Sequence, residues 1–149
     1  MRKVARRLLA AVLAGALLGA PAAFAEVVDG IAIDQRGQTA RIQLRLTVPV
    51  RYVRHSPPER GQLVVVVLEA LAAEPLGPIS PIEEVKRTRE TARVPRFTVR
   101  VSVDPTCNPA SARPLCLVLR FERPVRYRVR LGPDSRSIVV DVLPQERTP

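Results

Sequence analysis

Apolar and polar residues alternate along several stretches of this chain. Residues 41–46 change between polar and apolar at every step, and the stretches 115–121 and 125–131 carry an apolar residue at each odd-numbered position. Because successive side chains of a β-strand point to opposite faces, this period of two predicts strands with one buried face. The stretches 56–61 and 132–135 contain proline and glycine beside polar residues, and they predict turns between strands.

The same strand pattern occurs twice. At an offset of 75 positions, residues 41–68 pair with residues 116–143, and eleven of these 28 pairs are identical. The identities include the run from Pro49 to Tyr52, which recurs from Pro124 to Tyr127. Regular self-similarity of this kind indicates an internal duplication.

The duplication predicts four strands in each copy. The copies extend over about 27–71 and 96–144, each opens with one further strand, at 27–34 and at 96–103, and a linker of residues 72–95 joins them. We therefore expect an all-β fold of two four-stranded antiparallel sheets, one from each copy, that bury their apolar faces against each other as a sandwich. The linker is expected to be a solvated connector with one weak helical turn.

The chain begins with a pattern typical of export. Residues 1–7 carry four basic side chains, residues 8–20 are apolar without a charge, and residues 23–25 read Ala-Phe-Ala. This order predicts a helical signal peptide of residues 1–25, a mature domain of residues 26–149 and a periplasmic location. The apolar run is shorter than the roughly 20 residues that span a bilayer, so we expect no stable membrane span after cleavage.

Charge and cysteine content narrow the function classes further. Of the net charge of +10, four cations lie in the signal peptide, which leaves +6 on the mature chain, and tryptophan is absent. Scattered arginines with so few aromatic residues argue against a nucleic-acid partner. Cys107 and Cys116 are the only cysteines and flank a proline-rich stretch, which in an oxidising compartment predicts a local disulfide. A metal or redox site is disfavoured, because there is no C-x-x-C spacing and His55 is the only histidine.

The repeated unit resembles the AMIN domain, a non-catalytic module of periplasmic proteins. The resemblance rests on the alternating strand, the strand that begins at Pro124 to Tyr127, and the valine-rich closing strand 137–143 with Asp141; the first copy has Val66 at the matching position. It implies a symmetric pair of four-stranded sheets that attaches its owner to peptidoglycan or to an envelope protein complex, and it covers about residues 27–144.

No set of residues in the sequence resembles an active site. His55 lies in a turn without a matching nucleophile and acid, and neither a glycine-rich phosphate loop nor a zinc-ligand cluster is present, so we expect neither catalysis nor a cofactor. The best candidate site is basic. Arginines at every second position of a strand form a row that can bind carboxylates, and the candidate ligand-binding residues are Arg120, Arg123, Arg126, Arg128 and Arg130.

The sequence therefore favours a non-catalytic periplasmic binding or targeting module whose basic sheet surface attaches to peptidoglycan or to acidic envelope proteins. Two alternatives remain open. One is an interaction adaptor that docks by adding a strand at a sheet edge. The other is a small exported hydrolase.

Overall fold

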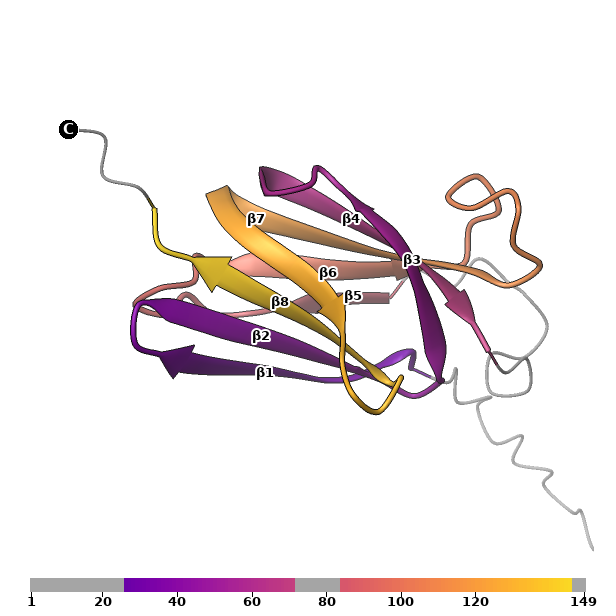
Figure 1. Ribbon diagram of the computed structural model, residues 1–149, viewed down its shortest axis with the longest axis horizontal. Helices are drawn as coiled ribbons and strands as arrows, with labels where there is room; N and C mark the ends of the chain where they lie inside the picture. The colour runs from indigo at the N-terminus through magenta and orange to yellow at the C-terminus, as the bar shows by residue number, and fades with distance from the viewer. Residues whose placement is uncertain (1–25, 72–83, 146–149) are drawn as a thin grey trace, which may run out of the picture.

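The computed structural model of the chain describes residues 26–71 and 84–145 (Figure 1). The predicted signal peptide and its helix lie outside these residues. The described part is all β, which confirms the fold class expected from the alternation, and it contains no helix that could cross a membrane. Its strands are β1 (Val28–Arg36), β2 (Thr39–Leu46), β3 (Val50–Ser56), β4 (Arg60–Ala70), β5 (Glu84–Arg87), β6 (Phe97–Ser102), β7 (Pro114–Leu131) and β8 (Ser137–Leu143).

The strands form one hydrogen-bonded sheet, and β7 belongs to both of its halves. The strand order is β1-β2-β8-β7-β4-β3, with β6 also paired to β7 and β5 paired to β6, and all pairs are antiparallel. The first part of β7, as far as Phe121, pairs with β4 and β6, and the last part, from Arg126, pairs with β8. We call β3, β4, the first part of β7, β6 and β5 layer A. Layer B consists of β1, β2, β8 and the last part of β7.

The expectation of two separate four-stranded sheets is therefore wrong. The described residues form a single eight-stranded sheet, because β7 passes from one layer into the other without a break. Residues 122–124 are exposed at this crossing. β4 pairs with β7 on both sides of it, from Glu69↔Pro114 to Arg60↔Arg126, with a register shift between Gly61 and Leu63. A register shift of this kind bends a strand and increases its twist, and here it allows the ladder to follow β7 across the crossing.

The two copies of the repeat are interleaved. β4 of the first copy pairs with β7 of the second, and β8 of the second copy pairs with β2 of the first. Each layer thus combines strands of both copies. The cross-strand partners Tyr52↔Leu68 and Tyr127↔Val142 show that the offset of 75 positions falls to 74 in the closing strands. The position equivalent to Asp141 is therefore Val67, and Val66 is instead equivalent to the core residue Val140.

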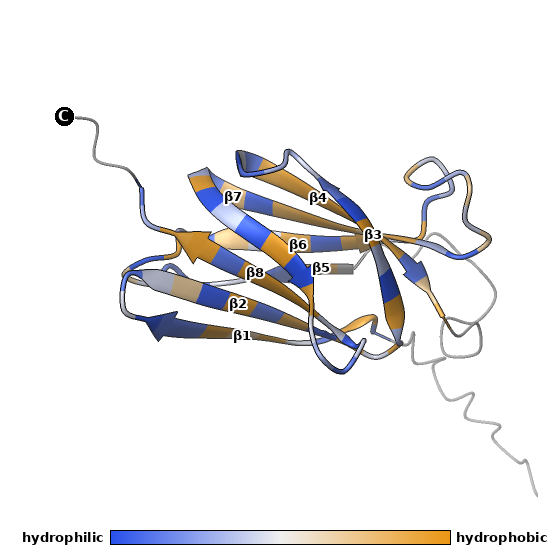
Figure 2. Ribbon diagram, in the orientation of Figure 1, coloured by the Kyte–Doolittle hydropathy of each residue, from blue (hydrophilic) through white to orange (hydrophobic). Residues whose placement is uncertain are grey.

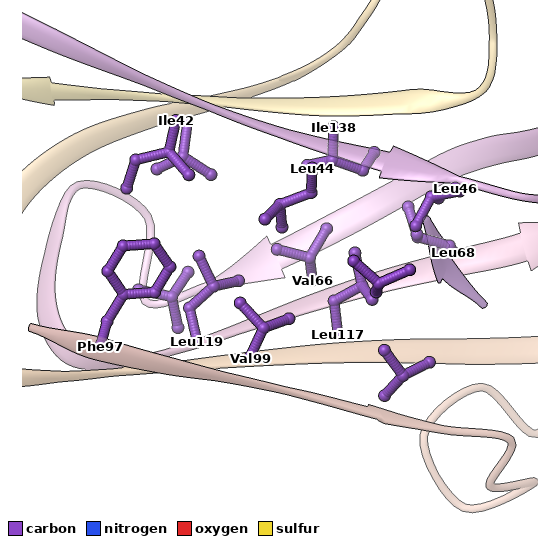
Figure 3. Close-up of a cluster of buried hydrophobic side chains, with 14 of the residues drawn as sticks. Ile42, Leu44, Leu46, Val66, Leu68, Phe97, Val99, Leu117, Leu119 and Ile138 are labelled. Atoms are coloured by element: carbon purple, nitrogen blue, oxygen red, sulfur yellow. The ribbon is translucent and has the colours of Figure 1, made fainter. Parts of the chain in front are cut away.

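The hydrophobic core lies between the two layers. Figure 3 shows Ile42, Leu44 and Ile138 of layer B opposite residues of layer A such as Phe97 and Leu117. All of these side chains are at most 1 % exposed. In Figure 2 the alternation along β2 is visible as successive polar and apolar bands. The core therefore lies between two layers of strands, as the alternation predicted. The strands of each layer, however, come from both copies of the repeat and not from one copy each.

The described part of the linker contributes a strand. β5 pairs with β6 from Glu84↔Val101 to Arg87↔Thr98 and forms one edge of layer A. Thr88 continues this contact, since its backbone N–H donates to the carbonyl of Phe97 at 2.9 Å. Residues 84–95 of the linker therefore add a strand to the sheet where a solvated connector with a helical turn was expected, and residues 72–83 of the linker lie outside the described residues.

Cys107 and Cys116 lie at disulfide distance, with their Cα atoms 6.4 Å apart, as their spacing predicted. Cys116 is buried on the outer face of layer A, beside its cross-strand partner Val67. In a turn just before Cys107, the Asp104 carboxylate accepts hydrogen bonds from the backbone N–H and the hydroxyl of Thr106. These hydrogen bonds lower the pKa of Asp104. The side chain of Arg54 on β3 donates to the carbonyl of Cys107 at 3.4 Å, so the start of the loop lies beside one end of the outer face.

The position of the core predicts that truncating two leucines on opposite faces of layer A changes the free energy of unfolding by very different amounts. Leu117→Ala removes a fully buried side chain from between the layers and should lower the free energy of unfolding by about 2 to 5 kcal/mol. Leu63→Ala, at a side chain that is 43 % exposed, should cost less than about 1 kcal/mol. Urea denaturation of both variants measures the difference. Equal losses would contradict the assignment of inner and outer faces.

The cysteine pair predicts a stability that depends on the redox state. Reduction should lower the free energy of unfolding by about 2 to 3 kcal/mol, because it removes a short cross-link that restricts the unfolded chain. The measurement is urea denaturation with and without reductant. The double variant Cys107→Ala/Cys116→Ala is the control and should not respond to reductant. An unchanged midpoint for the parent chain would show that the bond is not formed.

Candidate functional site

The structure separates the five predicted arginines into three places. Arg126, Arg128 and Arg130 follow one another along the outer face of layer B, as the alternation predicted. Arg120 lies on the outer face of layer A, where its cross-strand partner is Leu63. Arg123 lies at the crossing between the layers, where its Nη1 is 2.9 Å from Oε1 of Glu90. The structure therefore places Arg126, Arg128 and Arg130 in one row. Arg120 and Arg123 do not join this row, because β7 changes layer between Arg120 and Arg126.

Asp141 organises the middle of the basic face of layer B. Its Oδ1 accepts a hydrogen bond from Nε of Arg41 at 2.9 Å, and its Oδ2 lies 3.4 Å from Nε of Arg130. One carboxylate is thus shared by arginines from the two strands that flank β8. Because these side chains are partly exposed, the pairs contribute little to stability, but they hold two guanidinium groups in place and offset part of their charge.

A groove lies beside this face, between the β3–β4 turn and the last part of β7. Its volume is about 450 Å³, which is within the range of small-ligand sites. The groove combines two arginines, one carboxylate, two ring side chains and an apolar lining. The residues that line it are His55, Pro58, Glu59, Arg126, Tyr127, Arg128, Val129 and Leu143.

Tyr127 anchors the β3–β4 turn to β7. Its hydroxyl donates to the carbonyl of Pro57 at 2.6 Å, and its backbone N–H donates to the carbonyl of Glu59 at 2.9 Å. The side chain is fully buried, and burial raises its pKa to about 12. The phenol therefore stays protonated over the physiological range and remains a hydrogen-bond donor to the turn.

His55 closes the other side of the turn. Its Nε2 lies 2.8 Å from the carbonyl of Pro58, to which it donates, and its Nδ1 contacts the hydroxyl of Tyr52. The ring also lies between the two tyrosines, with 6.0 Å between ring centroids on each side. Both nitrogens are thus engaged within the chain, and the ring supports the groove wall instead of presenting a free nitrogen. Burial raises the pKa of Tyr52 as well.

The groove is not apparent from the sequence. Its walls come from β3 and the following turn on one side and from β7 and β8 on the other, more than 60 positions apart, whereas the spacing of arginines reports only one strand. The repeat places Tyr52 and Tyr127 at equivalent positions, but only the structure shows that both rings lie against His55 beside the groove. Among residues 26–71 and 84–145, no three His, Cys, Asp or Glu side chains are grouped as metal ligands would be.

Comparison with models of known protein families, with curated proteins and with solved structures found no match for this chain. The resemblance to the AMIN domain therefore rests on the residues named for it in the sequence.

The buried phenol predicts a stability that falls in alkaline solution. The folded state holds the Tyr127 proton up to about pH 12, whereas an ordinary tyrosine loses it near 10.0. Its contribution to the free energy of unfolding should be complete below pH 10 and should be lost between about pH 10 and 12. The Tyr52→Phe variant retains a single tyrosine, so its ultraviolet absorbance titration reports Tyr127 alone. A midpoint near 10 in the folded variant would contradict the burial of the phenol.

Proposed function

We propose that this chain is a non-catalytic periplasmic binding module that attaches to peptidoglycan through the groove beside the basic face of layer B. The observation that carries the proposal is the placement of Arg126 and Arg128 at the rim of a groove with an apolar lining. Guanidinium groups bind carboxylates with two parallel hydrogen bonds, and the apolar lining suits the hydrocarbon part of a short peptide.

The stem peptides of peptidoglycan have matching chemistry. They present free carboxylates, and their diamino acid supplies an amine. Glu59 at the same groove is the group that would pair with this amine, while the two arginines bind the carboxylates. A ligand with both charges fits this groove better than a purely anionic one, because Glu59 would repel the latter.

Two features of the sequence support the proposed location. The predicted signal peptide would export the chain to the compartment that contains peptidoglycan. The resemblance to the AMIN domain implies the same class of ligand. The cysteine pair at disulfide distance also fits an oxidising compartment.

The test is sedimentation with purified sacculi, using variants with equal changes of charge. Arg126→Glu/Arg128→Glu should weaken binding by about tenfold or more, because it replaces two carboxylate-binding groups with repelling ones. The control is Arg87→Glu/Arg89→Glu, at exposed positions on the other layer and in the loop after it, and it should bind as the parent does. Equal losses in both variants would show that only net charge matters and would overturn the assignment of the groove.

Salt dependence separates the proposal from docking by strand addition. Charge-driven binding to sacculi should weaken steeply above about 0.1 to 0.2 M salt, where charges more than about 10 Å apart are screened. Strand addition at an edge such as β1 rests on backbone hydrogen bonds and should persist at high salt. Persistent binding together with an unaffected groove variant would favour the adaptor instead.

A further inference from the structure

The outer face of layer A is apolar where a solvated sheet face should be polar. β4 carries an unbroken apolar run from Leu63 to Leu68, and the middle of the strand is coloured as hydrophobic in Figure 2. Continuous runs of this kind are typical of strands that are covered on both faces. Only one face of β4 packs into the core, through residues such as Val64 and Val66. The other face includes Leu63, which is 43 % exposed.

The duplication provides an internal reference for this face. On layer B, the outward residues of β2 and β8 include Gln43 and Asp141, which are polar. Their equivalents on layer A are Val118 and Val67. These two positions are thus polar on one layer and apolar on the other, whereas Val65 and its equivalent Val139 are apolar on both. Because equivalent strands of the two copies have the same structure, forming the strand does not itself require apolar residues at the outward positions of layer A.

The disulfide loop accounts for part of this surface. Val67 and Cys116 are buried at the end where the loop lies, whereas Leu63 and Val118 line an open hollow at the other end. The hollow has a volume of about 310 Å³, and its remaining lining residues are Thr98, Arg100 and Arg120. Among the described residues, Leu63 on β4 is exposed and Val118 on β7 is half-buried, and together they form an apolar strip with arginines beside it.

The charges on this strip have one sign. Arg100 and Arg120 line the hollow, and Arg87, the cross-strand partner of Thr98, extends the row to β5. No acidic residue lines the hollow among the described residues. Of the carboxylates on this face, Glu69 pairs with Arg51, and Glu122, two residues beyond Arg120 on β7, pairs with Arg96. A second copy of this chain would bring arginines against arginines, so charge complementarity selects an acidic partner.

We propose that the outer face of layer A is a docking surface for an acidic amphipathic helix of a partner protein. The helix would place its apolar side on Leu63 and Val118 and its carboxylates on Arg100 and Arg120. The dimensions agree, because strands lie about 4.8 Å apart and the distance from β4 across β7 to β6 therefore matches a helix diameter of about 10 Å. This surface is separate from the groove proposed for peptidoglycan, which lies against the other layer.

The test uses a designed helical peptide of about 18 residues, five turns, with leucines along one side and glutamates on both flanks. Its binding to the full mature chain is measured by fluorescence anisotropy. We expect Leu63→Gln and Arg120→Glu each to weaken binding by about tenfold, and a peptide with lysines in place of the glutamates not to bind. Both substitutions are at exposed outer-face positions, so circular dichroism should show an unchanged fold.

Arg128→Glu is the matched control, because it makes the same change of charge on the other layer. It should leave peptide binding unchanged while sacculus binding falls, so the two proposals can fail independently. Three results would overturn the docking surface: no binding of the acidic peptide, binding that is insensitive to Leu63→Gln, or equal binding of the lysine peptide. A dimer of the parent chain that Leu63→Gln dissociates in analytical ultracentrifugation would also overturn it, in favour of a second copy.

Discussion

A single strand, β7, joins the two layers of the sheet and holds them together. β7 supplies inward-facing residues on both sides of its crossing, such as Leu119 before it and Tyr127 after it, and all of them meet the same core. β4 remains paired to β7 across the crossing, so the layers cannot separate without breaking backbone hydrogen bonds as well as exposing the core. The crossing also explains why arginines that are close in sequence point away from different layers.

Interleaving of the two copies gives each closing strand, β4 and β8, a neighbour on both sides. If each copy had formed its own sheet, every layer would present edges to solvent along its closing strand. Instead, each closing strand lies between one strand of its own copy and one of the other. This arrangement gives both valine-rich strands two partners. It also brings the β3–β4 turn of the first copy against β7 of the second, and so creates the groove that neither copy contains alone.

The two outer faces have diverged from a common pattern. Layer B carries the arginine row, which Asp141 partly neutralises, and the groove beside it. Layer A carries the apolar strip and the cysteine pair. A duplicated fold with two chemically different faces is suited to contact two different ligands at once. The proposed peptidoglycan groove and the proposed helix-docking surface would together make the chain a link between the cell wall and an acidic envelope protein.

Local features of the fold follow from the amino-acid sequence alone. Alternation identified the β fold, the self-comparison identified the repeat, and the short spacing of Cys107 and Cys116 identified a pair at disulfide distance, because each is a property of neighbouring residues. Three further outcomes appear only in the folded chain: the sheets merge through β7, the copies exchange strands, and Arg120 and Arg123 lie outside the arginine row. These outcomes depend on which strands hydrogen-bond over long sequence distances, and the period of two is the same whichever partner a strand selects.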